Sequence, residues 1–153
     1  MRQDGWYNRS ELQCLQTGDV ILTPSLIPGT DIVVPTINHV GIIGKVCGMN
    51  YIFHIPWGKT PILESLEIFE QKRKIVSVLR NDDTQKLTDE QLINNYHAVV
   101  GKTYSFFGHN CEDFIRCMTK DTVDIGFDQR CGYACILAII LVLIFFLYLI
   151  RKK

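Results

Sequence analysis

Residues 37–55, INHVGIIGKVCGMNYIFHI, contain two short segments rich in β-branched and aromatic residues, separated by glycine and polar residues. This composition favours strands. Ile37–Ile43 and Tyr51–Ile55 are therefore predicted to form two strands, joined by a turn within Lys45–Asn50. A connection this short brings the two strands together as an antiparallel hairpin.

The hairpin carries one histidine on each strand, His39 and His54, whose positions differ by fifteen, an odd number. In an antiparallel pair the positions of opposed residues add to a constant, and side chains alternate between the two faces. If that constant is odd, the two histidines share a face, opposite or diagonal to each other. If it is even, they face apart, and the sequence leaves both arrangements open.

Strand patterns dominate the first half of the chain and helix patterns the second, which predicts an α+β fold with an antiparallel sheet. The capping box Thr88–Gln91 opens one predicted helix, which ends at Gly101. The other predicted elements are strands at Val20–Leu22 and Ile75–Leu79, a loop at Pro24–Pro35, and helices at Ser65–Lys72 and Asn110–Thr119.

The charges balance at 16 basic and 16 acidic residues. Because nucleic-acid binders usually carry a basic surplus, no nucleic-acid partner is expected. All eighteen residues of Tyr133–Ile150 are apolar, and Arg130 and Arg151 flank them. Eighteen helical residues span about 27 Å, close to one hydrocarbon core. The run therefore predicts a C-terminal transmembrane anchor.

The expected organisation is a domain at 1–120, a polar linker at 121–131, the anchor at 132–150 and a basic tail at 151–153. The N-terminus has no signal-peptide pattern, so the expected localisation is a single-pass, tail-anchored membrane protein with its domain in the cytosol. Six cysteines without a Cys-x-x-Cys pair fit that compartment.

Cys111 is a candidate nucleophile because it follows Asn110, a good helix N-cap. The first turn of a helix favours a thiolate, although the charges of Glu112 and Asp113 oppose it. A cysteine at a helix start, with a strand histidine and a residue that orients it, is the papain-type arrangement. The simpler alternative is a small core cysteine.

The other histidines are weaker candidates. His109 is interpreted as a solvated loop residue and His97 as a surface residue of a helix. His39, His54 and Cys111 are also zinc-ligand types, but no zinc spacing motif accompanies them. No metal or other cofactor is expected.

Residues 110–114, NCEDF, closely resemble the Asn-Cys-Glu-His-Phe motif of the lecithin–retinol acyltransferase-like family, which includes the HRAS-like suppressor phospholipases and acyltransferases. That family belongs to the permuted branch of the NlpC-type papain-like superfamily, in which the histidine strand precedes the cysteine helix. Residues 17–21, 39–42 and 99–105 resemble other landmarks of the family. The resemblance covers roughly residues 15–120 and the tail. Asp113 departs from it, because the family has histidine there.

The resemblance implies a permuted papain-like fold and a membrane-anchored thiol acyltransferase or phospholipase A acting on phospholipid esters. Cys111 would be the nucleophile, His39 the base and His54 the residue that orients His39. Residues 18–22, 39–42 and 77–80 also resemble the bacterial and poxviral amidase and peptidase branch, so a cysteine amidase is the first alternative. A catalytically silent tail-anchored adaptor is the second.

Overall fold

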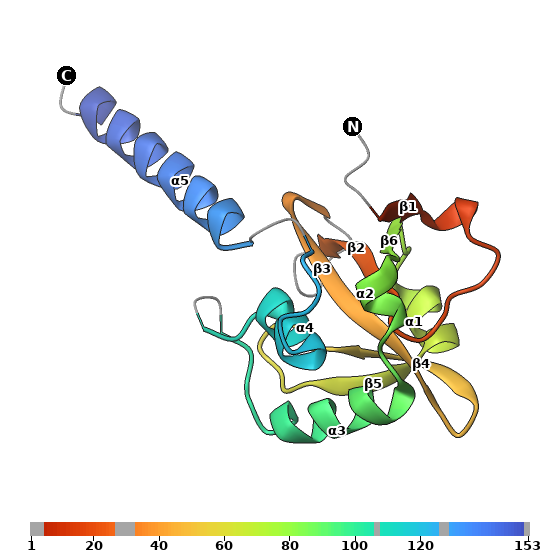
Figure 1. The fold of residues 1–153 in the computed structure, drawn as a ribbon. Helices are drawn as coiled ribbons and strands as arrows, with labels where there is room; N and C mark the ends of the chain where they lie inside the picture. The colour runs from red at the N-terminus through yellow and green to blue at the C-terminus, as the bar shows by residue number, and fades with distance from the viewer. Residues whose placement is uncertain (1–4, 27–32, 106–107, 126–128, 152–153) are drawn as a thin grey trace.

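The computed structural model of the chain describes residues 5–26, 33–105, 108–125 and 129–151. One antiparallel sheet of six strands has the order β1-β6-β2-β3-β4-β5. Shorter helices lie against the sheet, whereas the C-terminal helix extends away from it (Figure 1). This is the α+β arrangement that the sequence predicts. The strands are β1 Trp6–Asn8, β2 Val20–Leu26, β3 Val33–Val46, β4 Met49–His54, β5 Ile62–Ser65 and β6 Ser77–Leu79. The helices are a 3₁₀ turn at Arg9–Glu11, α1 Leu66–Lys72, α2 Asp82–Gln85, α3 Asp89–Val99, α4 Cys111–Thr119 and α5 Gln129–Arg151.

Several predicted elements differ from the observed ones in length. β2 continues through Pro24 to Leu26 and β3 begins at Val33, so the predicted loop Pro24–Pro35 is shorter than expected, and its residues 27–32 lie outside the described part of the chain. The four-residue strand β5 was missed, because so short a segment shows no clear alternation.

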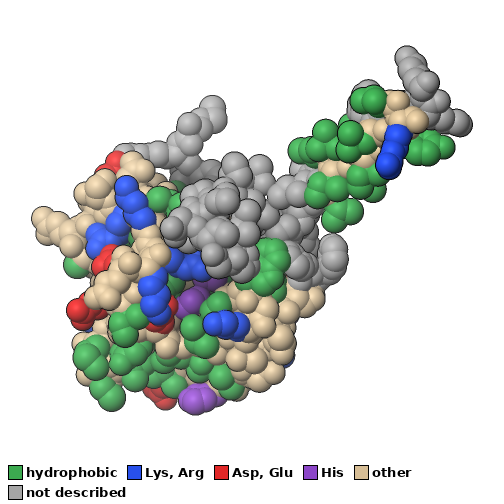
Figure 2. All heavy atoms as spheres, turned by 180° about the vertical axis from the view of Figure 1, so that it is seen from behind, with side chains coloured by type: hydrophobic (Ala, Val, Ile, Leu, Met, Phe, Trp, Pro, Cys, Tyr) green, Lys and Arg blue, Asp and Glu red, His purple; other side chains and the backbone are tan. Residues whose placement is uncertain are grey.

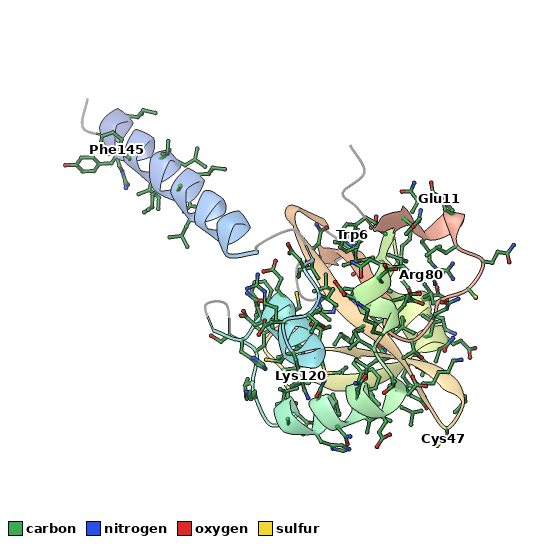
Figure 3. All side chains as sticks on the ribbon, in the orientation of Figure 1. Trp6, Glu11, Cys47, Arg80, Lys120 and Phe145 are labelled. Carbon is green, nitrogen blue, oxygen red and sulfur yellow. The ribbon has the colours of Figure 1, made fainter. Side chains whose placement is uncertain are left out.

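The hairpin of β3 and β4 turns through only two residues, Cys47 and Gly48, which lie at its tip (Figure 3). Both have positive φ, 51° and 80°. Two central residues with positive φ define a type I′ turn, whose twist matches that of the flanking strands. The turn places Val46 opposite Met49, so partner positions add to an odd number along the whole hairpin.

Both faces of the sheet are covered, and neighbouring residues of one strand serve different cores. Val20, Ile42 and Phe53 pack with α3 and α4 residues in the larger core. Ile21, Ile43 and Ile52 pack with Phe69 of α1 in the smaller one. Burial on both faces explains why these strands are runs of apolar residues rather than alternating ones. We call these two sides of the sheet the α4 face and the α1 face.

The start of β2 is tied to the end of β6 by a buried carboxylate. Asp19 is fully buried, and its two oxygens accept hydrogen bonds from Arg80 Nε and Nη2 at 2.7 and 2.6 Å. The preceding Gly18 has φ +90°, and a Cβ there would lie 1.9 Å from Thr84 O. The Gly-Asp pair thus has a structural role, since it turns the chain into the sheet and anchors it.

The C-terminal segment requires a correction. The chain forms helix α5 there, but no helix within the described residues is long and apolar enough to cross a membrane. The predicted transmembrane anchor at 132–150 and the single-pass, tail-anchored localisation are therefore withdrawn.

The type I′ turn makes a prediction about stability. Gly48→Val places a β-branched residue at positive φ and should lower the free energy of unfolding by about 1–3 kcal/mol. Cys47→Asn should raise it by a few tenths to about 1 kcal/mol, because asparagine tolerates this conformation better than cysteine. Urea denaturation followed by circular dichroism measures both changes. Equal stability of the two variants would contradict the assigned turn.

Candidate active site

The amino end of α4 is built by Asn110, which caps the helix. Its buried side-chain oxygen accepts from the backbone N–H groups of Glu112 and Asp113 at 2.9 and 3.0 Å. Asp113 completes the capping box, since its carboxylate accepts from Asn110 N at 3.2 Å. This confirms the predicted N-cap and accounts for the asparagine of the motif. It also shows that the Asp113 carboxylate is bound to the backbone of the cap.

Cys111, the first residue of α4, is only 2% exposed. Its Sγ lies 3.9 Å from the backbone oxygen of Asn38, the residue immediately before His39. That oxygen belongs to the peptide bond that joins Asn38 to His39, so the thiol lies close to the backbone of His39 on β3. The structure thus brings the predicted nucleophile to the predicted histidine strand.

The strand pair β2–β3 is irregular at this point. Pro24 is opposite Asn38, but the next residue, Ser25, is opposite Val34, so three residues of β3 are skipped in the pairing. Such bulges disrupt the ladder, bend the strand and redirect side chains. The bulge ends directly before Asn38 and His39, where Cys111 approaches the sheet.

His39 and His54 share the α1 face of the hairpin and form a close pair. Gly41 is the residue opposite His54, which makes the two histidines diagonal neighbours. His39 Nε2 and His54 Nδ1 are 2.9 Å apart, and the rings are nearly perpendicular, with centroids 5.1 Å apart. Opposed positions of β3 and β4 add to an odd number, which was one of the two cases that the sequence left open.

Gly41 provides the space that this ring pair needs. A Cβ on Gly41 would lie 2.7 Å from a methyl carbon of Ile52 and 3.2 Å from the Cβ of His54. The His54 ring is held from its other side by Phe69 of α1, at a centroid distance of 5.2 Å. The His54 position is therefore fixed by packing as well as by its hydrogen bond.

Glu64 of β5 approaches the far side of the histidine pair. Its Oε2 lies 3.5 Å from His54 Nε2, and its Oε1 pairs with the ammonium of Lys72. The His54 side chain is 3% exposed and that of Glu64 14%, whereas that of Lys72 is 61% exposed. The polar groups thus run from His39 through His54 to a carboxylate near the surface.

The environment favours neutral histidines. Burial, followed by the nearby His54 and Arg73, holds the pKa of His39 well below its ordinary value of 6.5. Burial also lowers the pKa of His54 to about 4, against an opposing effect of Glu64. Arg73 lies within electrostatic range of Cys111 and Glu64 as well, and burial lowers the pKa of its guanidinium. A neutral imidazole is the form that can accept a thiol proton.

Four residues of this site were not predicted from the sequence: Thr23, Gly41, Glu64 and Arg73. Thr23 lies directly opposite His39 and is fully buried, and its hydroxyl has no hydrogen-bond partner among the described residues. All four reach the site through strand pairing or helix packing. No local pattern reveals this for Thr23, Glu64 or Arg73. Gly41 did give a local signal, since an isolated glycine in a strand often marks a close approach.

The remaining histidines lie elsewhere. His97 is exposed on α3, as expected. His109 was interpreted as solvated but is 9% exposed, and it lines an open cavity of about 570 Å³ beside Asp113, Arg116 and Cys117. Those three residues lie on the face of α4 opposite Cys111, so the cavity is separate from the thiol. On the face drawn in Figure 2, histidine side chains near the centre lie close to Lys and Arg side chains, and another histidine lies at the lower edge.

Within the described residues, no group of three or more His, Cys, Asp and Glu side chains is arranged to hold a metal ion. Comparison of the chain with protein-family models, with curated proteins and with solved structures finds no match.

The lowered pKa of His54 predicts a pH-dependent stability. The unfolded chain takes up a proton near pH 6.5, whereas the folded chain does so only near pH 4. The corresponding stability, on the order of 3 kcal/mol, is therefore fully present above pH 6.5 and is lost as the pH falls toward 4.

Urea denaturation between pH 7.5 and 4 measures this loss. His54→Asn removes one of the two buried titrating rings, so it should reduce this loss and leave only the part that comes from His39, whereas the control His97→Asn on the exposed face of α3 should leave the loss unchanged. A wild-type stability that stays constant from pH 6.5 to 4.5 would contradict the prediction.

Proposed function

We propose that this chain is a cysteine-dependent acyltransferase or hydrolase, with Cys111 as nucleophile, His39 as base and His54 as the residue that orients His39. One observation carries the proposal: the Cys111 thiol, at a capped helix start, lies beside the strand position of His39, whose Nε2 is bound to His54. Since Nε2 of His39 is occupied, its Nδ1 is the nitrogen that remains to exchange a proton with the thiol.

The proposed reaction has two halves. The Cys111 thiol gives its proton to His39 Nδ1, and the thiolate adds to the acyl carbonyl carbon. The oxyanion forms at the amino end of α4, where the helix dipole stabilises negative charge. His39 then protonates the leaving group, and the acyl chain stays on sulfur as a thioester.

In the second half, water or an acceptor alcohol or amine gives a proton to His39 and attacks the thioester. The Cys111 sulfur leaves and recovers its proton from His39, so the enzyme returns to its starting state. Water gives hydrolysis and an acceptor gives acyl transfer. His54 holds the imidazole in place throughout and takes no part in bond making.

The proposed acyl donor is a phospholipid ester, because the NCEDF segment at 110–114 resembles the motif of a lipid acyltransferase family. An amide donor would use the same three residues. The full chain should therefore be incubated with phosphatidylcholine vesicles carrying a labelled acyl chain and, in parallel, with labelled peptide amides. Release of free fatty acid or transfer of label supports the lipid substrate. Cleavage of the peptides alone would assign the amidase alternative, and no reaction with either would leave the adaptor.

Cys111 should carry the acyl group. Brief incubation with the lipid should add the mass of one acyl chain to Cys111, in a bond that hydroxylamine cleaves. Cys111→Ala should abolish both the adduct and turnover without unfolding the chain, since alanine is well tolerated in a helix. Cys117→Ala, on the opposite face of α4, is the matched control and should retain both. An active Cys111→Ala protein would rule out the assigned nucleophile.

His39 should act as base down to unusually low pH. His39→Ala should lower kcat by about 10²–10⁴-fold, and His54→Ala should lower it less. Because the pKa of His39 lies well below 6.5, kcat/KM should stay constant from pH 7.5 down past 6.5 and fall only at lower pH. His97→Asn should change neither value. An acid limb at or above pH 6.5 would be inconsistent with His39 in this buried environment.

A further inference from the structure

The buried Nε2 of His54, which faces away from His39, has no role in the proposed reaction. This nitrogen is inaccessible to solvent, and no described group lies within hydrogen-bond geometry of it. Glu64 Oε2 approaches it at 3.5 Å, beyond the 2.7–3.2 Å of an ordinary N–H···O bond. A buried ring nitrogen without a hydrogen-bond partner lowers the stability of the fold. The contact with Glu64 therefore affects which nitrogen of His54 carries the proton.

We infer that Glu64 is a positioning residue that sets the tautomers of both histidines through its contact with His54 Nε2. This inference rests on the proposed function for its consequence, the reactivity of His39. Its physical basis, the contact with the carboxylate, stands without that function.

The carboxylate determines which nitrogen of His54 carries the proton. An imidazole lone pair on Nε2 would face the negative charge of Glu64, whereas an N–H there is attracted to it. The second carboxylate oxygen, Oε1, is engaged by the Lys72 ammonium, which fits an ionised group. A neutral His54 therefore carries its proton on Nε2 and keeps a bare lone pair on Nδ1.

The state of His54 then determines that of His39. The 2.9 Å contact joins His54 Nδ1 to His39 Nε2, and a hydrogen bond needs one donor. With Nδ1 of His54 bare, His39 Nε2 must be the donor. A neutral His39 that is protonated on Nε2 has its lone pair on Nδ1, the nitrogen that the proposed reaction requires as base. Without Glu64, His54 is free to protonate Nδ1, and this would place the His39 proton on Nδ1 instead.

Glu64 is also placed to act in this way by the sheet. It lies opposite Ile52 in the β4–β5 register, two residues from His54, and so belongs to the same α1 face. The side chain of Glu64 is mostly buried, and this strengthens its effect on a ring that is itself buried.

Nitrogen-15 NMR of the full chain, labelled in its histidines, tests the inference directly, because the two nitrogens of a neutral ring give different shifts. At pH 7 the wild-type protein should show His39 and His54 both protonated on Nε2. Glu64→Leu should shift His54, and with it His39, toward protonation on Nδ1. Glu64→Gln should keep the wild-type pattern, since its amide oxygen can still accept from Nε2–H. Lys72→Met, which removes only the partner of Glu64, should keep it as well.

Activity provides the second readout. Glu64→Leu should lower kcat at least about tenfold with little change in KM, and Glu64→Gln should stay within about threefold of wild type. Unchanged ring tautomers in a folded Glu64→Leu protein would overturn the inference, even if Cys111 forms its thioester. The wild-type pattern and its loss in Glu64→Leu, in a chain without acyl-transfer activity, would support the inference and overturn only the proposed function.

Discussion

The two-residue turn at Cys47–Gly48 is the constraint on which the site depends, because it fixes the register of β3 against β4. With Val46 opposite Met49, His39 and His54 point to the same face and their ring nitrogens meet at 2.9 Å. A slip by one residue would exchange the faces of every side chain on β4. It would place His54 among the apolar residues of the α4 face and bring Phe53 beside Gly41, so core packing and the turn favour the same register.

Burial explains the chemical state of the histidine pair and also its stability cost. Removing His39 and His54 from water disfavours their charged forms, and the nearby Arg73 guanidinium acts in the same direction. The rings are therefore neutral across the neutral pH range, as a base requires. The same desolvation makes the fold less stable under acidic conditions, since the unfolded chain protonates these rings at a higher pH than the folded chain does. Glu64 opposes this trend, because it raises the pKa of His54 from the outer end of the pair.

Sequence reasoning was most successful where the cause is local. The Asn110 cap, the Thr88 capping box and the α+β class follow from patterns within a few residues, and each is present. The shared face of His39 and His54 could be narrowed only to two cases, because the turn geometry that decides between them involves a cysteine at positive φ, an uncommon choice for that position. Glu64 and Arg73 could not be found at all, since a short edge strand and the end of α1 bring them to the site. The membrane-span prediction was wrong: it rested on the length of the apolar run and on the arginines that flank it, and no helix within the described residues is long and apolar enough to cross a membrane.

The sheet itself imposes the last requirement on the site. Cys111 packs with the apolar core on the α4 face, whereas His54 packs against Phe69 on the α1 face. A regular ladder would keep these two layers apart, because β-sheet backbone would lie between a thiol on one side and an imidazole on the other. The ladder is not regular there: three residues of β3 leave the pairing directly before Asn38, whose carbonyl the thiol approaches. The bulge therefore interrupts the pairing of β2 and β3 where the thiol from the α4 face approaches the strand that carries His39 on the α1 face. In the proposed reaction, the acyl donor would therefore have to reach Cys111 and His39 at this end of β2 and β3.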